Sequence, residues 1–187
     1  MTDLHPRVIR WLQQHYPKPT LDPDWLNDCL DWLINQQHYS LDTDPNAFYA
    51  ALESQLLQSN LQDSMLHGTG LPIHIALPTT TTVLTGPPIL VEISAMTEIA
   101  HSAFNLDQIR AAREERSRSG RDMSNNIDED GDIDVDEGPP PKYSRGMLRF
   151  TLTDGATSLP AIEYKPIPQL VLGVTPLGYK VRLPNTS

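Results

Sequence analysis

The chain has only one cysteine, Cys29, so no internal disulfide can hold its fold together. No apolar run approaches the roughly 20 residues that a membrane span requires, and the N-terminus lacks the apolar core of a signal peptide. Basic residues are also scarce, because 14 lysines and arginines face 24 aspartates and glutamates, which gives a net charge of −10. These deficits predict a soluble, intracellular protein with little non-specific affinity for DNA.

The sequence signatures of catalysis are missing as well. The six histidines are scattered without metal-ligand spacing, and there is no phosphate-binding loop, dinucleotide glycine pattern or nucleophile elbow. Cys29 lacks the histidine and asparagine pattern of a nucleophile, and the role of a small buried apolar residue fits it better. The sequence therefore predicts a protein that is not an enzyme and that binds neither a metal nor a cofactor.

Three amphipathic helices are predicted in the first part of the chain. The first covers residues 5–16, and the other two begin at Asp22-Pro23 and Asp44-Pro45, where a capping aspartate precedes a proline in the first turn. Apolar residues recur at helical spacing in each, which predicts a three-helix bundle over residues 1–66. The tryptophans are expected in its core, with a protein-docking groove as the alternative: Trp11, Trp25 and Trp32.

Extended segments dominate the rest of the chain. Residues 67–88 are rich in glycine, proline and threonine, and are expected to form a linker. In the first strand after it, Ile89, Val91, Ile93 and Ala95 are expected to share one face. Asp154-Gly155 predicts a tight turn between the second and third strands. Four strands are expected in all, over residues 89–99, 146–153, 159–165 and 179–183.

A long charged segment, about residues 102–143, separates the first two strands. Residues 105–121 are expected to be partly helical, whereas residues 117–141 are rich in serine, glycine, proline and acids and are expected to be disordered. Residues 126–137 match the spacing of a calcium-binding loop, but the Gly-Pro-Pro-Pro that follows forbids the exiting helix, so an acidic disordered run is the preferred interpretation. Five arginines precede this run and suggest either a solvated loop, docking to an acidic partner or nuclear targeting.

Single-stranded nucleic-acid binding is an alternative function. Residues 142–187 carry six basic and two acidic side chains, in contrast to the acidic remainder of the chain. A basic face with exposed rings can bind phosphates and stack bases. The candidate residues for this alternative are Arg149, Lys165, Tyr179 and Arg182.

Three features, in order, resemble the N-terminal region of the RecQ-mediated genome instability protein 1 family. The first is a helical part with VIRWLQQHY, PDWLNDCLDWL and AFYAALESQLLQSNL. The second is the strand ILVEISAMTEI followed by a long insertion, and the third combines MLRFTLTDG, AIEYKPIPQL and PLGYKV. The resemblance spans nearly the whole chain.

The resemblance implies an α+β chain in which the three-helix bundle precedes an oligonucleotide/oligosaccharide-binding (OB) fold over residues 89–187. It also implies a non-catalytic scaffold in the nucleus that binds topoisomerase III and works with a RecQ-family helicase. Such a complex dissolves double Holliday junctions during DNA replication, repair and homologous recombination. The insertion and barrel residues assigned to partner binding on this basis are Phe104, Leu106, Ile109, Arg113 and Lys165.

One feature departs from the family pattern. A closed OB barrel has five strands, whereas only four are predicted here, so the barrel is expected to be incomplete with an exposed edge. Either the chain is truncated before the last strand, which is the favoured interpretation, or another chain completes the barrel.

Overall fold

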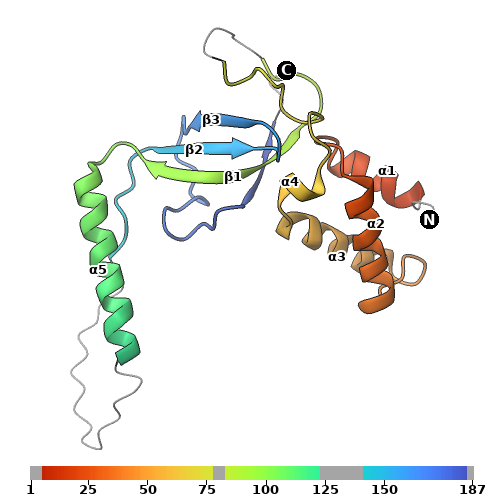
Figure 1. The fold of residues 1–187 in the computed structure, drawn as a ribbon, viewed down its shortest axis with the longest axis horizontal. Coiled ribbons are helices and arrows are strands. Elements are labelled where there is room, and N and C mark those ends of the chain that lie inside the picture. Colours follow the sequence, from red (N-terminus) through yellow and green to blue (C-terminus); the bar gives the residue numbers. More distant parts are fainter. Residues whose placement is uncertain (1–5, 78–82, 123–140, 185–187) are drawn as a thin grey trace, which may run out of the picture.

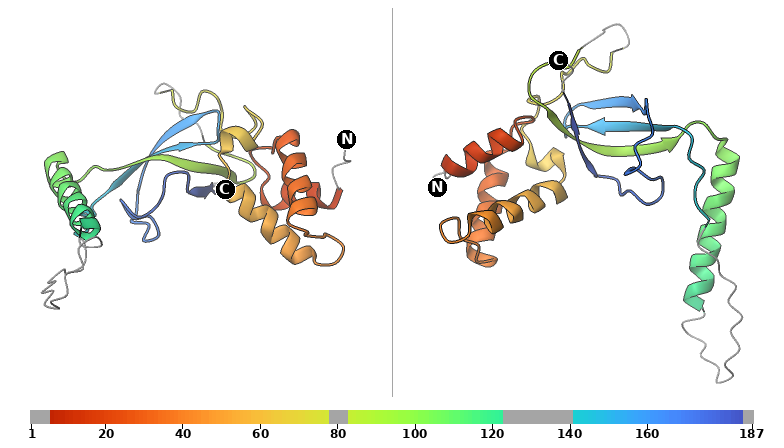
Figure 2. Two further views of the ribbon diagram at one scale, coloured as in Figure 1. Left: turned by 60° about the horizontal axis from the view of Figure 1, so that its bottom comes forward. Right: turned by 180° about the vertical axis from the view of Figure 1, so that it is seen from behind.

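The computed structural model describes residues 6–77, 83–122 and 141–184. A bundle of helices comes first, a four-stranded antiparallel sheet follows, and the long helix α5 projects from the sheet (Figure 1). The bundle and α5 lie at opposite ends of the sheet in every view (Figure 2). The chain is therefore α+β, as predicted, and its described strands do not close into a barrel.

Aspartate caps explain where two helices of the bundle begin. Asp22 accepts hydrogen bonds from the backbone N–H groups of Asp24 and Trp25, and Asp44 accepts one from Ala47. A proline follows each aspartate, at a position where its missing N–H costs nothing. Both predicted starts are confirmed. The bundle consists of α1 (Pro6–His15), α2 (Pro23–Asp31), the π-helical turn Trp32–Gln36, α3 (Pro45–Gln58) and α4 (Leu61–Ser64).

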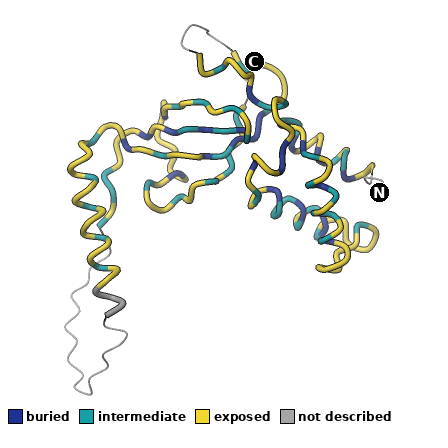
Figure 3. Tube along the Cα trace, in the orientation of Figure 1, coloured by how far each residue is buried: buried dark blue, intermediate teal, exposed yellow. Residues whose placement is uncertain are grey.

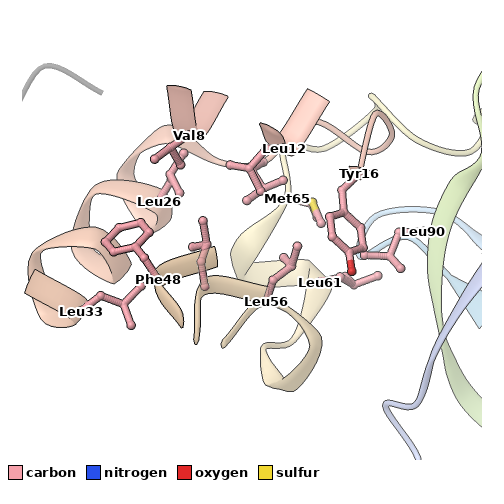
Figure 4. Packing of buried hydrophobic residues seen from close by; sticks show 12 residues of the cluster. Val8, Leu12, Tyr16, Leu26, Leu33, Phe48, Leu56, Leu61, Met65 and Leu90 are labelled. Carbon is pink, nitrogen blue, oxygen red and sulfur yellow. The ribbon is translucent and has the colours of Figure 1, made fainter. Parts of the chain in front are cut away.

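The bundle core is mainly aliphatic (Figure 4). Leu33, Leu56 and Leu61 are fully buried in the same cluster as Phe48. The three tryptophans expected in the core are only half-buried and pack against its outside. Trp11, for example, stacks on the ring of Tyr49 at a centroid distance of 4.9 Å. The predicted tryptophan core is therefore wrong in detail, because leucines fill the centre and the larger rings cover it.

The sheet has the strand order β3-β2-β1-β4. Its strands are β1 (Ile89–Glu98), β2 (Leu148–Thr153), β3 (Ser158–Ile162) and β4 (Lys180–Leu183), close to the predicted positions. Gly155, at a φ of 97°, makes the predicted turn after Asp154. Leu148 and Phe150, on the inner face of β2, belong to the core of the sheet. Leu71 is part of the same core, although it lies in the segment predicted as a linker.

A β-bulge in β1 changes which side chains face the core. Ile93 pairs with Leu152 and Ala95 pairs with Thr151. Two residues along β1 therefore correspond to one residue along β2, and Ser94 is the extra residue. Beyond it, Met96 and Glu98 turn to the inner face. The prediction that Ala95 shares the face of Ile93 is wrong, because one extra residue reverses the alternation of a strand.

The insertion between β1 and β2 starts with a helix, α5 (Ala103–Asp122). Arg110 pairs with Asp107 at 2.8 Å and with Glu114 at 2.6 Å, one turn away on either side. The predicted helical character of residues 105–121 is therefore confirmed, whereas the expectation of disorder is wrong for residues 117–122, which continue the same helix. Residues 123–140 lie outside the described residues, and so does the calcium-loop match at 126–137.

The bundle and the sheet are packed on each other. Leu90 of β1 is buried in the bundle core (Figure 4), and its N–H donates to the carbonyl of Lys18 at 2.8 Å. Lys180 of β4 donates to Glu92 Oε2 at 2.8 Å and to the Ser59 carbonyl at 2.6 Å. The Lys180 side chain is only 5% exposed, so this ammonium group joins the two parts from within.

The substitution Lys180→Met should lower the free energy of unfolding by about 3 kcal/mol, because it leaves the Glu92 carboxylate, whose side chain is only 12% exposed, without its cation. Urea unfolding followed by circular dichroism measures the loss. Arg10→Met, at an exposed position on α1, is the control. Equal stability of the two variants would show that the ion pair does not hold the bundle to the sheet.

Candidate partner-docking site on the insertion

One buried carboxylate holds both ends of the insertion. Glu98 is 3% exposed at the end of β1 and accepts hydrogen bonds from three backbone N–H groups, those of Ala100 at 2.6 Å, Gly146 at 2.8 Å and Met147 at 3.1 Å. Ala100 leaves the sheet, while Gly146 and Met147 lead back into it. Burial alone would raise the pKa of Glu98, but these hydrogen bonds outweigh it and lower the pKa to about 2.

A second buried carboxylate secures the start of β2. Both guanidinium Nη atoms of Arg145 donate to Glu163, one of them at 2.7 Å, and the N–H groups of Leu148 and Ile167 donate to the same carboxylate. The hydrogen bonds from Arg145 lower the pKa of Glu163 and prevail over burial, which acts in the opposite direction. The chain that returns from the insertion is therefore fixed to the sheet by charged hydrogen bonds.

Tyr143 fixes α5 to the loop between β3 and β4. The guanidinium of Arg113 on α5 lies 5.3 Å from the centre of the Tyr143 ring, and it also donates to the carbonyl of Pro141 at 3.3 Å. Gly173 approaches the same ring so closely that a Cβ there would lie 2.6 Å from it. The ring thus contacts both the helix and the loop.

Helix α5 has one half-buried face and one exposed face (Figure 3). Leu106, Ile109 and Arg113 are half-buried, and Leu106 lines a shallow groove of about 380 Å³ together with Tyr143. Phe104, in the first turn, is 69% exposed. An exposed aromatic ring on a projecting helix is the kind of side chain that a partner protein buries.

The five residues predicted to bind a partner are divided between the insertion and the sheet. Phe104, Leu106, Ile109 and Arg113 lie on α5, whereas Lys165 is exposed just beyond β3. Sequence reasoning missed Glu98 and Glu163 as determinants of this site. The sequence carries no signal for Glu98, because alternation from Ile89 puts it on the outer face and two of its hydrogen-bond donors, Gly146 and Met147, are distant in the chain.

The four candidate nucleic-acid residues are not brought together. Arg149 lies on β2 and Lys165 beyond β3, whereas Tyr179 and Arg182 belong to the region of β4, at the other edge of the sheet. Arg182 also donates to the carbonyl of His15 at 2.6 Å and lies over the ring of Tyr16 in the bundle. These residues therefore do not form one basic face.

Within residues 6–77, 83–122 and 141–184, no group of three or more histidine, cysteine or acidic side chains is placed to hold a metal ion. In the same ranges, no helix combines the length and the apolar character needed to cross a bilayer. Cys29 is half-buried, and burial raises the pKa of its thiol to about 11, which disfavours the reactive thiolate.

Two family models match the chain. The model of the RMI1 N-terminal helical domain matches residues 8–64, and that of the RMI1 N-terminal OB-fold domain matches residues 71–187. The chain belongs to the RMI1 family. Its bundle corresponds to the RMI1 helical domain and its sheet to the RMI1 OB fold, which confirms the resemblance seen in the sequence. A sequence comparison with curated proteins gave no match.

The stability of the chain should fall in acid through Glu98. The pKa of this carboxyl is about 2 in the folded chain and near its ordinary value of 4.5 when unfolded. Its contribution is therefore complete above pH 4.5 and is lost as the pH falls toward 2. Urea unfolding across this range should show a flatter pH dependence for Glu98→Gln. The same flattening in the exposed Asp28→Asn control would contradict this assignment.

The substitution Gly173→Ala should loosen α5, because the new methyl group collides with Tyr143. Gly68→Ala is a matched control, since Gly68 has almost the same φ of 77°, compared with 76° at Gly173, but open space around it. Both variants carry similar backbone strain. Hydrogen exchange should become faster in α5 only in Gly173→Ala. Equal exchange of the α5 amides in both variants would show that Tyr143 does not position the helix.

Proposed function

We propose that this chain is a non-catalytic scaffold subunit of a nuclear complex in which topoisomerase III and a RecQ-family helicase dissolve double Holliday junctions. Membership of the RMI1 family is the observation that carries this proposal. In this role the chain supports DNA replication, repair and homologous recombination, and so maintains genome stability. It supplies contacts and position, while its partners supply the chemistry.

Topoisomerase III binds to the OB fold and its insertion in this proposal. The base of the insertion is fixed by Glu98, and α5 is held at a second point by Tyr143. A helix that is already ordered loses less conformational entropy on binding than a free segment does. Phe104, near the start of α5, is then available as the apolar contact that a pocket of the topoisomerase buries.

Single-stranded nucleic-acid binding is the alternative, and it has less support. The four residues considered for it are spread over both edges of the sheet, and Arg182 is bound to the bundle. Base stacking along one strand requires rings and cations that follow a common path.

The substitution Phe104→Ala should weaken the binding of topoisomerase III at least about tenfold, because it removes an aromatic contact from the interface. Isothermal titration calorimetry with purified topoisomerase III measures the change. Since the Phe104 ring is mostly exposed, the free energy of unfolding should stay the same.

Tyr39→Ala is the matched control, because it removes an exposed aromatic ring from the bundle instead of from α5. Its affinity for topoisomerase III should equal that of the unsubstituted chain. Equal losses for both variants would contradict docking through α5. Absence of binding by the unsubstituted chain at micromolar concentrations would contradict the proposed function itself.

A further inference from the structure

The outer face of the sheet is divided into a covered and an uncovered part. Before the bulge, Leu90 and Glu92 of β1 point to the bundle, as do Lys180 and Arg182 of β4. After the bulge, neither the bundle nor α5 lies over the outer side of β1, β2 and β3 (Figures 1 and 3). Within the part of the chain that the structure describes, this region of the sheet is therefore open to solvent.

Four large apolar side chains lie on this uncovered part. Ile99 and Met147 are neighbours, since the N–H of Ile99 donates to the carbonyl of Met147 at 2.9 Å, and they are 41% and 42% exposed. Ile162 is 61% exposed, and Tyr164, just beyond the end of β3, is 94% exposed. Large apolar side chains left exposed along one region of a sheet indicate an interaction site.

Cations accompany these side chains, and among the described residues no acid lies on the outer side of β2 or β3. Arg149 pairs directly with Ile162 in the β2–β3 ladder, and the exposed Lys165 lies near it in the chain that leaves β3. Neither cation forms an ion pair within the described residues. The carboxylates of Glu98 and Glu163, at the ends of β1 and β3, are buried on the inner side and hydrogen-bonded there. In a chain of net charge −10, an outer surface with cations and no acid is selective for a negative partner.

We propose that this outer-face patch, formed by Ile99, Met147, Arg149 and Ile162 on the sheet and by Tyr164 and Lys165 just beyond β3, binds an acidic segment of a partner protein. Apolar side chains of that segment pack on the isoleucines, methionine and tyrosine, while its carboxylates pair with the arginine and the lysine. Tyrosine and arginine are the residue types that contribute most at such surfaces. The aliphatic side chains favour a peptide over a nucleic acid, whose charged backbone they cannot contact favourably.

The outer-face patch is separate from the exposed ring of Phe104. The patch lies on the strands, whereas Phe104 lies in the first turn of α5. The inference does not depend on topoisomerase binding, because it rests only on the exposure and charge of the sheet. The two interactions can therefore be lost independently, and a separate set of variants tests each.

Fluorescence anisotropy with a labelled peptide tests this proposal on the full chain. In the peptide, aspartates alternate with leucine and phenylalanine, and a control peptide has asparagine in place of aspartate. We expect submillimolar binding of the acidic peptide only, which weakens as salt is added. Arg149→Glu and Tyr164→Ala should each reduce the affinity at least about fivefold.

Two variants serve as matched controls. Arg10→Glu makes the same charge change on α1, and Phe104→Ala removes a different exposed aromatic ring. Neither should alter peptide binding. Absence of peptide binding, or equal losses in the controls, would overturn the proposal. Binding of an oligothymidine that is stronger than that of the peptide, and that is lost in Arg149→Glu, would overturn it in favour of a nucleic-acid site.

Discussion

The hydrogen bonds of the Glu98 carboxylate are the constraint on which the arrangement of the insertion depends. Three backbone N–H groups, from both the outgoing and the returning chain, donate to this one side chain. Because the carboxylate is buried, these groups would have no comparable acceptor if it were removed. The insertion can therefore be long and varied in composition while its base stays closed and β1 and β2 stay paired.

A buried charged group also joins the helical and the OB-fold parts. Lys180 and Glu92 form an ion pair where the bundle meets the sheet, and Leu90 of β1 completes the bundle core. A strand that belongs to both cores makes the two parts one unit. In a scaffold this matters, because a rigid unit presents α5 and the outer-face patch at fixed positions, which reduces the entropy lost when a partner binds.

Local signals account for what could be predicted from the sequence. Asp22 and Asp44 with their prolines set two helix starts, and the turn at Gly155 follows from residue type alone. The bulge at Ser94 could not be predicted, because it depends on pairing with a distant strand. Simple alternation from Ile89 places Glu98 on the outer face. The extra residue Ser94 turns it to the inner face instead, so the sequence pattern alone does not reveal the carboxylate that closes the insertion.

In the proposed function, the insertion binds topoisomerase III from a base that the sheet holds closed. The most direct test is calorimetric titration of topoisomerase III with a variant in which a short glycine–serine linker replaces residues 103–142. Since Ile99 and Met147 are hydrogen-bonded neighbours, such a linker can join the two strands. We predict that the variant unfolds at the same temperature as the full chain but loses topoisomerase III binding. Unchanged affinity would contradict the account.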